Sequence, residues 1–191
     1  MRAQNQNQPW FALIVSVWIM AAFSSATAQV RSQKIPDVLN VPDAGVLVLK
    51  ARGEGVQIYQ CKSAVDAAGA FEWVFQAPEA DLVNDKGQKI GKHYGGPTWE
   101  ANDGSQVMGQ LQQHVNARRP SAIPWLLLKA KSNEGTGIFK DVGYIQRLDT
   151  EGGKAPASGC EKQNAGAEAR VHYAANYYFY RSSALPDPHA P

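Results

Sequence analysis

Hydrophobic residues recur at every second position along most of the chain, which predicts β-strands rather than helices. The longest such row lies near the C-terminus and consists of Val171, Tyr173, Ala175, Tyr177 and Phe179. A strand places alternate side chains on opposite faces, so these five residues would share one face.

Shorter rows of the same period occupy residues 56–58, 71–75 and 142–148. Two further runs, 46–49 and 125–128, are apolar at consecutive positions, and the second is typical of a central strand. Residues 105–119 fit either helical or strand spacing. Gly109 disfavours the helix there, so we predict a strand and leave the helix as the alternative.

Glycine-rich segments separate these runs and predict turns, for example at residues 52–55, 95–96 and 152–153. About nine short strands, with no alternation of strands and helices, predict an all-β fold. We expect one antiparallel domain at residues 44–181, either a β-sandwich or a β-barrel.

The first 28 residues predict a secretory signal peptide. Arg2 precedes a largely apolar run at residues 10–23, and small residues follow up to Ala28. The alternative is a membrane anchor, but the run is shorter than the roughly 20 residues that span a bilayer. We therefore expect cleavage after Ala28, export to the periplasm or the extracellular space, and no membrane span in the mature chain.

Two polar segments flank the predicted domain. Residues 29–43 contain two prolines and predict an extended lead-in, while residues 182–191 contain three prolines and predict a loose tail. The 191 residues carry 19 basic and 17 acidic side chains without a basic block, so no nucleic-acid partner is indicated.

The chain has two cysteines, Cys61 and Cys160. In an exported protein two cysteines are most simply paired, so we predict a disulfide. The alternatives are two buried thiols or half of a metal site, but no CxxC motif or neighbouring histidine supports the latter. We expect no metal and no cofactor.

Several segments together resemble a secreted family of bacteria and fungi known as domain of unknown function 3455. They are GVQIYQC at 55–61, HYGGPTWE at 93–100, WLLLKA at 125–130, IQR at 145–147 and GC at 159–160. The resemblance covers roughly residues 35–181. It implies export and one β-rich domain, but it brings no catalytic residues with it.

The densest group of chemically capable side chains is His93, Tyr94, Trp99 and Glu100 around a Gly-Gly-Pro loop. Aromatic rings beside an imidazole and a carboxylate suit a sugar ring or a planar ligand, so we consider these four residues candidate ligand-binding residues. The alternative is a hairpin whose aromatic residues belong to the core.

Glu100, Asp103 and His93 are the candidates for catalysis. Two carboxylates roughly 5–9 Å apart could hydrolyse a glycoside. The alternative is that Asp103 caps its turn and Glu100 faces solvent. The leading hypothesis is thus non-catalytic binding of a small molecule or glycan at residues 93–103. A glycan hydrolase and a structural, envelope-associated protein without a small ligand are the other hypotheses.

Overall fold

The computed structural model describes residues 34–42, 45–65 and 69–181. The predicted signal peptide at 1–28 and the predicted tail at 182–191 lie outside these ranges. In the described ranges, no helix has the length and hydrophobicity needed to cross a membrane.

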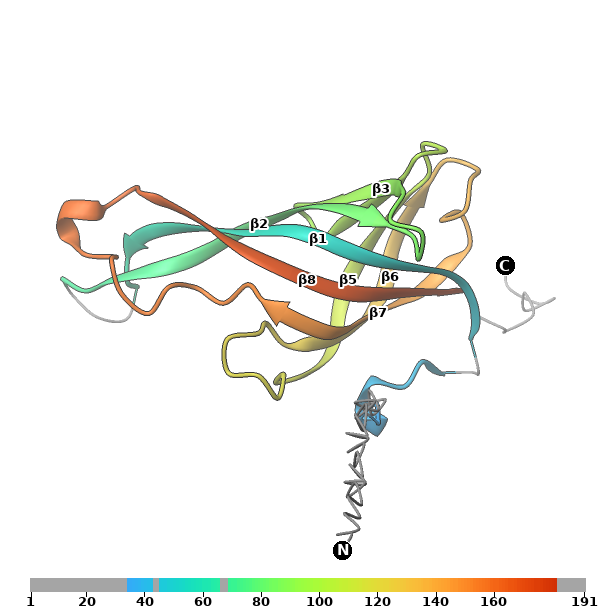
Figure 1. The fold of residues 1–191 in the computed structure, drawn as a ribbon, viewed down its shortest axis with the longest axis horizontal. Helices are drawn as coiled ribbons and strands as arrows, with labels where there is room; N and C mark the ends of the chain where they lie inside the picture. Colours follow the sequence, from blue (N-terminus) through green and yellow to red (C-terminus); the bar gives the residue numbers. More distant parts are fainter. Residues whose placement is uncertain (1–33, 43–44, 66–68, 182–191) are drawn as a thin grey trace, which may run out of the picture. The chain divides into compact units, whose positions relative to one another are not determined.

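The described residues form an all-β fold of eight antiparallel strands (Figure 1). The strands are β1 (Val46–Ser63), β2 (Phe71–Val83), β3 (Lys89–Tyr94), β4 (Thr98–Ala101), β5 (Gln106–Val115), β6 (Trp125–Glu134), β7 (Val142–Gly152) and β8 (Glu168–Arg181). Each strand pairs with the next, and β1 pairs with β8, so the sheet closes. Of the two predicted architectures, the structure is therefore the barrel.

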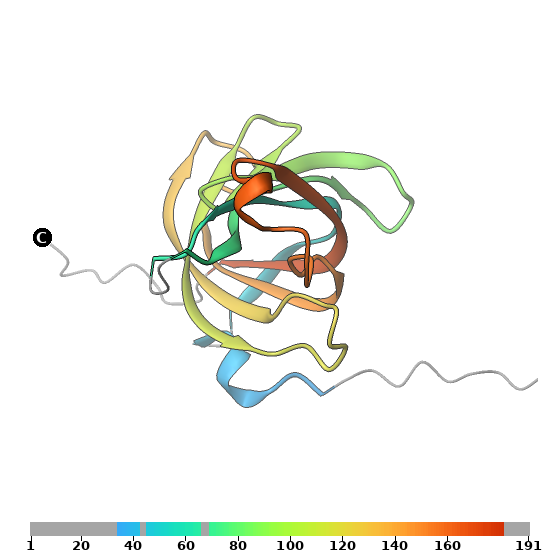
Figure 2. The same ribbon diagram turned by 90° about the vertical axis from the view of Figure 1, so that its left-hand side faces the viewer.

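An eight-stranded barrel has an interior just wide enough to be filled by side chains or to hold one small ligand. β1, β2 and β8 are the longest strands, and they extend beyond the shorter strands toward the left of Figure 1. Figure 2 looks at the barrel from that side and shows the strands arranged around a common centre.

The prediction of a turn at residues 52–55 is wrong, because β1 runs through them without a break. Both glycines instead allow a neighbouring group to approach the backbone closely. A Cβ on Gly53 would lie 2.5 Å from the Tyr177 ring, and one on Gly55 would lie 2.1 Å from the Glu79 carbonyl oxygen. Glycine in a strand interior is typical where another group approaches the backbone this closely. The two apolar runs at 46–49 and 56–58 thus belong to one strand.

The ambiguous segment at 105–119 contains a strand, β5, as predicted. Gly109 again marks a close approach, since a Cβ there would lie 3.0 Å from both the Trp99 ring and the Leu128 side chain. The absence of a side chain at Gly109 therefore reflects packing against the barrel interior.

One end of the barrel interior is filled by large buried side chains. Phe179 and Tyr177 point inward from β8, and Phe139 enters from the loop before β7. The ring centroids of Phe139 and Phe179 are 4.7 Å apart. Val107 and Ile145 complete this packed end, and both are fully buried.

A second apolar cluster lies on the outside of β6 and β7. The predicted lead-in contributes to it through a short 3-10 helix, η1 (Asp37–Leu39). Leu39 is fully buried against Trp125, Leu127 and Leu148. The Gln146 side-chain amide also donates a 2.6 Å hydrogen bond to the Leu39 carbonyl oxygen. Part of the lead-in thus docks on the barrel wall.

Candidate functional site

The other end of the barrel contains a cavity of about 490 Å³. Most of its lining is apolar: Tyr59, Phe75, Pro78, Pro97, Trp99, Leu111, Ile123, Pro124, Leu126 and Leu128. Its polar lining residues are Gln57, Gln76, His93 and Arg147. Phe75 and Leu111 are 48% and 52% exposed, so the cavity reaches the surface at their side.

His93 and Trp99 lie at the inner end of this cavity and are 3% and 1% exposed. They face each other across the β3–β4 pair, and their rings stack with centroids 4.3 Å apart and 4° between planes. Trp99 is therefore a core residue, as the alternative interpretation predicted, and it also forms part of the cavity wall.

The hydrogen bond of His93 determines which of its nitrogens carries a proton. Nδ1 lies 2.8 Å from the Thr98 carbonyl oxygen, which can only accept. Nδ1 therefore donates, and Nε2 remains an acceptor on a neutral ring. Burial lowers the pKa of His93 from 6.5 to about 3, so the ring stays neutral across the physiological range.

Tyr94 and Glu100, the other two predicted ligand-binding residues, do not line this cavity. Side chains alternate along a strand, so Tyr94 follows His93 on the outer face and Glu100 follows Trp99 there. The Tyr94 hydroxyl donates to Glu100 at 2.9 Å, and Lys92 forms a 3.2 Å ion pair with the same carboxylate. The structure thus divides the predicted group of four into two pairs on opposite faces of the wall.

Asp103 lies in the turn between β4 and β5. Its carboxylate accepts hydrogen bonds from the Ser105 backbone and hydroxyl at 2.9 and 2.6 Å, and from the Ile138 backbone at 2.8 Å. These bonds hold the turn against the loop before β7. They also lower the pKa of Asp103, with the Ser105 hydroxyl as the main cause.

The pKa of Glu100 is likewise lowered, mainly by the Tyr94 hydroxyl and then by Lys92. Glycoside hydrolysis by a carboxylate pair needs one carboxyl that remains protonated. The contacts of Glu100 and Asp103 favour ionisation of both. Neither residue lines the interior cavity.

Arg147 is a cavity residue that the sequence analysis did not identify. It points inward from β7, where it lies between Leu126 of β6 and Tyr177 of β8. Its Nε and Nη2 donate to the Pro124 carbonyl oxygen at 3.1 and 2.9 Å. In the described part of the chain, no carboxylate oxygen lies within 4.0 Å of its guanidinium. The sequence feature that could have identified Arg147 is its position two residues after the buried Ile145, because alternate residues of a strand share a face.

Two residues that line the cavity each carry a side-chain donor without a hydrogen-bond partner among the described residues. These donors are the indole Nε1 of Trp99 and the side-chain Nε2 of Gln57, and both atoms are buried behind the cavity surface. An indole N–H can only donate. Leaving a buried donor unpaired costs about 1–3 kcal/mol, so each of these two donors lowers the stability of the barrel.

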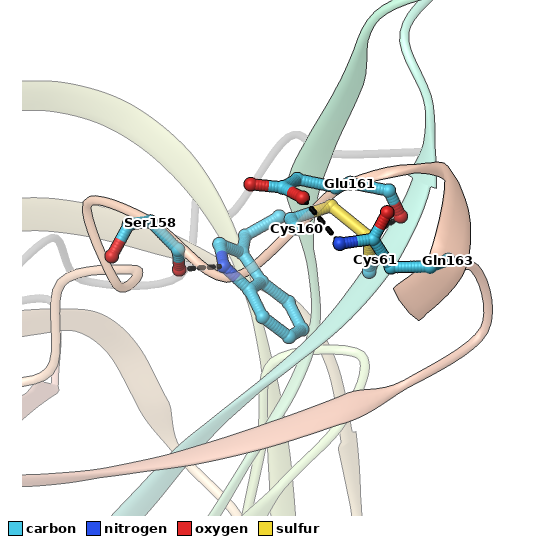
Figure 3. The surroundings of a disulfide bond; sticks show 6 residues. Cys61, Ser158, Cys160, Glu161 and Gln163 are labelled. Carbon is cyan, nitrogen blue, oxygen red and sulfur yellow. Dashed lines mark hydrogen bonds between the residues drawn. A yellow bond between two sulfur atoms is a disulfide. The ribbon is translucent and has the colours of Figure 1, made fainter.

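The predicted disulfide is confirmed between Cys61, near the end of β1, and Cys160, in the loop between β7 and β8 (Figure 3). Further hydrogen bonds hold the same loop, and two of them lie beside the disulfide. The Cys61 backbone donates to the Ala167 carbonyl oxygen at 2.9 Å, and the Trp73 indole donates to the Ser158 carbonyl oxygen at 3.0 Å. The bond therefore fixes the loop to the long strands near the hollow end of the barrel.

The fold and the cavity define a closed antiparallel β-barrel with an interior that could hold one small molecule. A family described as a protein of unknown function (DUF3455) matches residues 42–181, which include every strand of the barrel. The chain belongs to this family, and the resemblance in the sequence is confirmed. No curated protein and no solved structure matches the chain.

Proposed function

We propose that this protein binds a small, largely apolar molecule inside the barrel and does not transform it. The observation that carries the proposal is the cavity of about 490 Å³ in one end of a barrel whose other end is packed with aromatic side chains. Small-molecule sites are concave, mostly apolar and roughly 300–1,000 Å³ in volume, with a few polar groups that orient the ligand.

The rim of the cavity supports the same proposal. Phe75 and Leu111 are large apolar side chains at the surface, and both line the cavity. An apolar ligand would cover them as it enters, and their removal from water would favour binding. The proposal thus moves the predicted site from the loop around 93–103 to the barrel interior, and it retains His93 and Trp99 from the predicted residues.

The test is titration with N-phenyl-1-naphthylamine, a neutral apolar dye that fluoresces in apolar surroundings. We expect saturable binding at a single site. Leu111→Trp places a larger side chain in the mouth and should weaken binding at least about tenfold, which corresponds to 1.4 kcal/mol. Ile138→Trp is the matched control, because Ile138 is 41% exposed and does not line the cavity.

Equal binding by the two variants would show that the dye binds elsewhere. Absence of saturable binding to the unmodified protein would favour the structural, envelope-associated hypothesis instead.

We also propose that the protein is exported. The predicted signal peptide supports this, and a disulfide is typical of oxidising compartments. N-terminal sequencing of protein recovered outside the cytoplasm should begin at Gln29. A sequence beginning at Met1 would contradict cleavage.

A further inference from the structure

We infer that the ligand of the barrel carries a carboxylate, and that this carboxylate binds Arg147. The inference rests on the proposed function and adds the chemical class of the ligand. It begins from the charges of the residues in the cavity wall. Of the residues described as lining the cavity, Arg147 is the one with a permanent charge, and none is Asp or Glu.

The guanidinium of Arg147 is incompletely used by the protein. Two of its N–H groups donate to the Pro124 carbonyl oxygen, a neutral partner. A buried or half-buried cation is normally paired with a carboxylate, and none lies within 4.0 Å among the described residues. Arginine presents its donors as a planar fork that matches the two oxygens of a carboxylate. The ligand would thus supply the missing anion.

A carboxylate fits better than a phosphate. The cavity lining offers one guanidinium and no second permanent charge, so a group with a single negative charge is balanced there. A dianion would keep uncompensated charge in a cavity whose lining is mostly apolar. The rest of the cavity wall would contact the apolar or aromatic part of the ligand. The stacked rings of Trp99 and His93 form the inner end of the cavity.

The experiment compares three naphthalene probes of similar shape by isothermal titration calorimetry near neutral pH: naphthalene-2-carboxylate, naphthalene-2-carboxamide and 2-naphthyl phosphate. We expect the carboxylate to bind the unmodified protein at least about tenfold more tightly than the amide, as a charge-assisted pair predicts. Tighter binding of the phosphate, or equal binding of acid and amide, would overturn the inference. This comparison needs no variant.

Arg147→Met should remove the preference for the acid, so that naphthalene-2-carboxylate and naphthalene-2-carboxamide bind the variant with similar affinity. Arg170→Met is the matched control, since Arg170 lies on β8 outside the cavity lining, and its substitution removes the same charge. A preference for the acid that survives in Arg147→Met would overturn the assignment to this residue.

The two proposals fail in different ways. If N-phenyl-1-naphthylamine and all three naphthalene probes fail to bind, the proposed function is wrong. If the neutral dye binds but the carboxylate shows no advantage over the amide, only the carboxylate inference is wrong.

Discussion

The two ends of the barrel interior are built from the same eight strands but are filled differently. At the packed end, Phe139, Tyr177 and Phe179 meet ring to ring and are fully buried. At the hollow end, Arg147 and Gln57 point inward, and the space between the walls remains as the cavity. Inward-facing polar groups without partners lower stability, whereas aromatic packing raises it. This difference supports the proposal that the packed end maintains the fold and the hollow end binds a ligand.

A matched pair of substitutions should distinguish the two ends most strongly. Phe179→Ala removes a fully buried ring from the packed end and should cost about 3–5 kcal/mol of unfolding free energy. Phe75→Ala at the rim removes a ring that is 48% exposed and should cost less than about 1 kcal/mol. Urea unfolding of both variants measures the two costs. Similar costs would show that the hollow end contributes to stability as much as the packed end.

The disulfide should have the next largest effect. It joins residues 99 positions apart and fixes the loop between β7 and β8. Removing a cross-link enlarges the unfolded ensemble, so Cys160→Ser should lower the unfolding free energy by about 2–4 kcal/mol.

Thermal unfolding of the variant and of the reduced unmodified protein tests this prediction. The two treatments should lower the midpoint by similar amounts, and reduction should add nothing to the variant. Two free thiols per chain in the unfolded, unreduced protein would contradict the bond itself.

Because of His93, which lies between the two ends, the stability of the protein should depend on pH. The pKa of His93 is about 3 in the folded protein and 6.5 in the unfolded chain, so the unfolded chain binds the proton first as pH falls. Stability should therefore decrease from about pH 6.5 toward about pH 3 and be unaffected by this group above that range.

His93→Phe keeps an aromatic ring against Trp99 and should flatten this part of the pH profile, as measured by urea unfolding at several pH values. His114→Phe, on an exposed position of β5, is the control and should retain the dependence. An unchanged profile in His93→Phe would contradict the burial of a neutral imidazole.

The alternation of apolar residues was sufficient to predict an all-β antiparallel domain, because the period of a strand is a local property. Closure was not predictable in this way. It depends on pairing between β1 and β8, whose residues, such as Val56 and His172, are far apart in the sequence. The turn predicted at Gly53 and Gly55 failed for the same reason, since the close approach of Tyr177 is a long-range contact.

The candidate site was predictable only in part. His93 and Trp99 were identified as an aromatic pair near a loop, but the register Tyr94–Thr98 decides which side chains share a face. That register separates Tyr94 and Glu100 from the cavity. Arg147 was missed because a lone charge in a strand usually faces solvent, and only the closed barrel places its side chain in the interior.

The most direct test of a ligand site inside the barrel is the NMR signal of the Trp99 indole N–H during titration with N-phenyl-1-naphthylamine. Trp73 and Trp125 serve as internal controls, because neither lines the cavity. Binding in the hollow end should shift the Trp99 indole signal and leave the other two unchanged. A dye that binds while shifting Trp73 or Trp125 and not Trp99 would contradict the interior site.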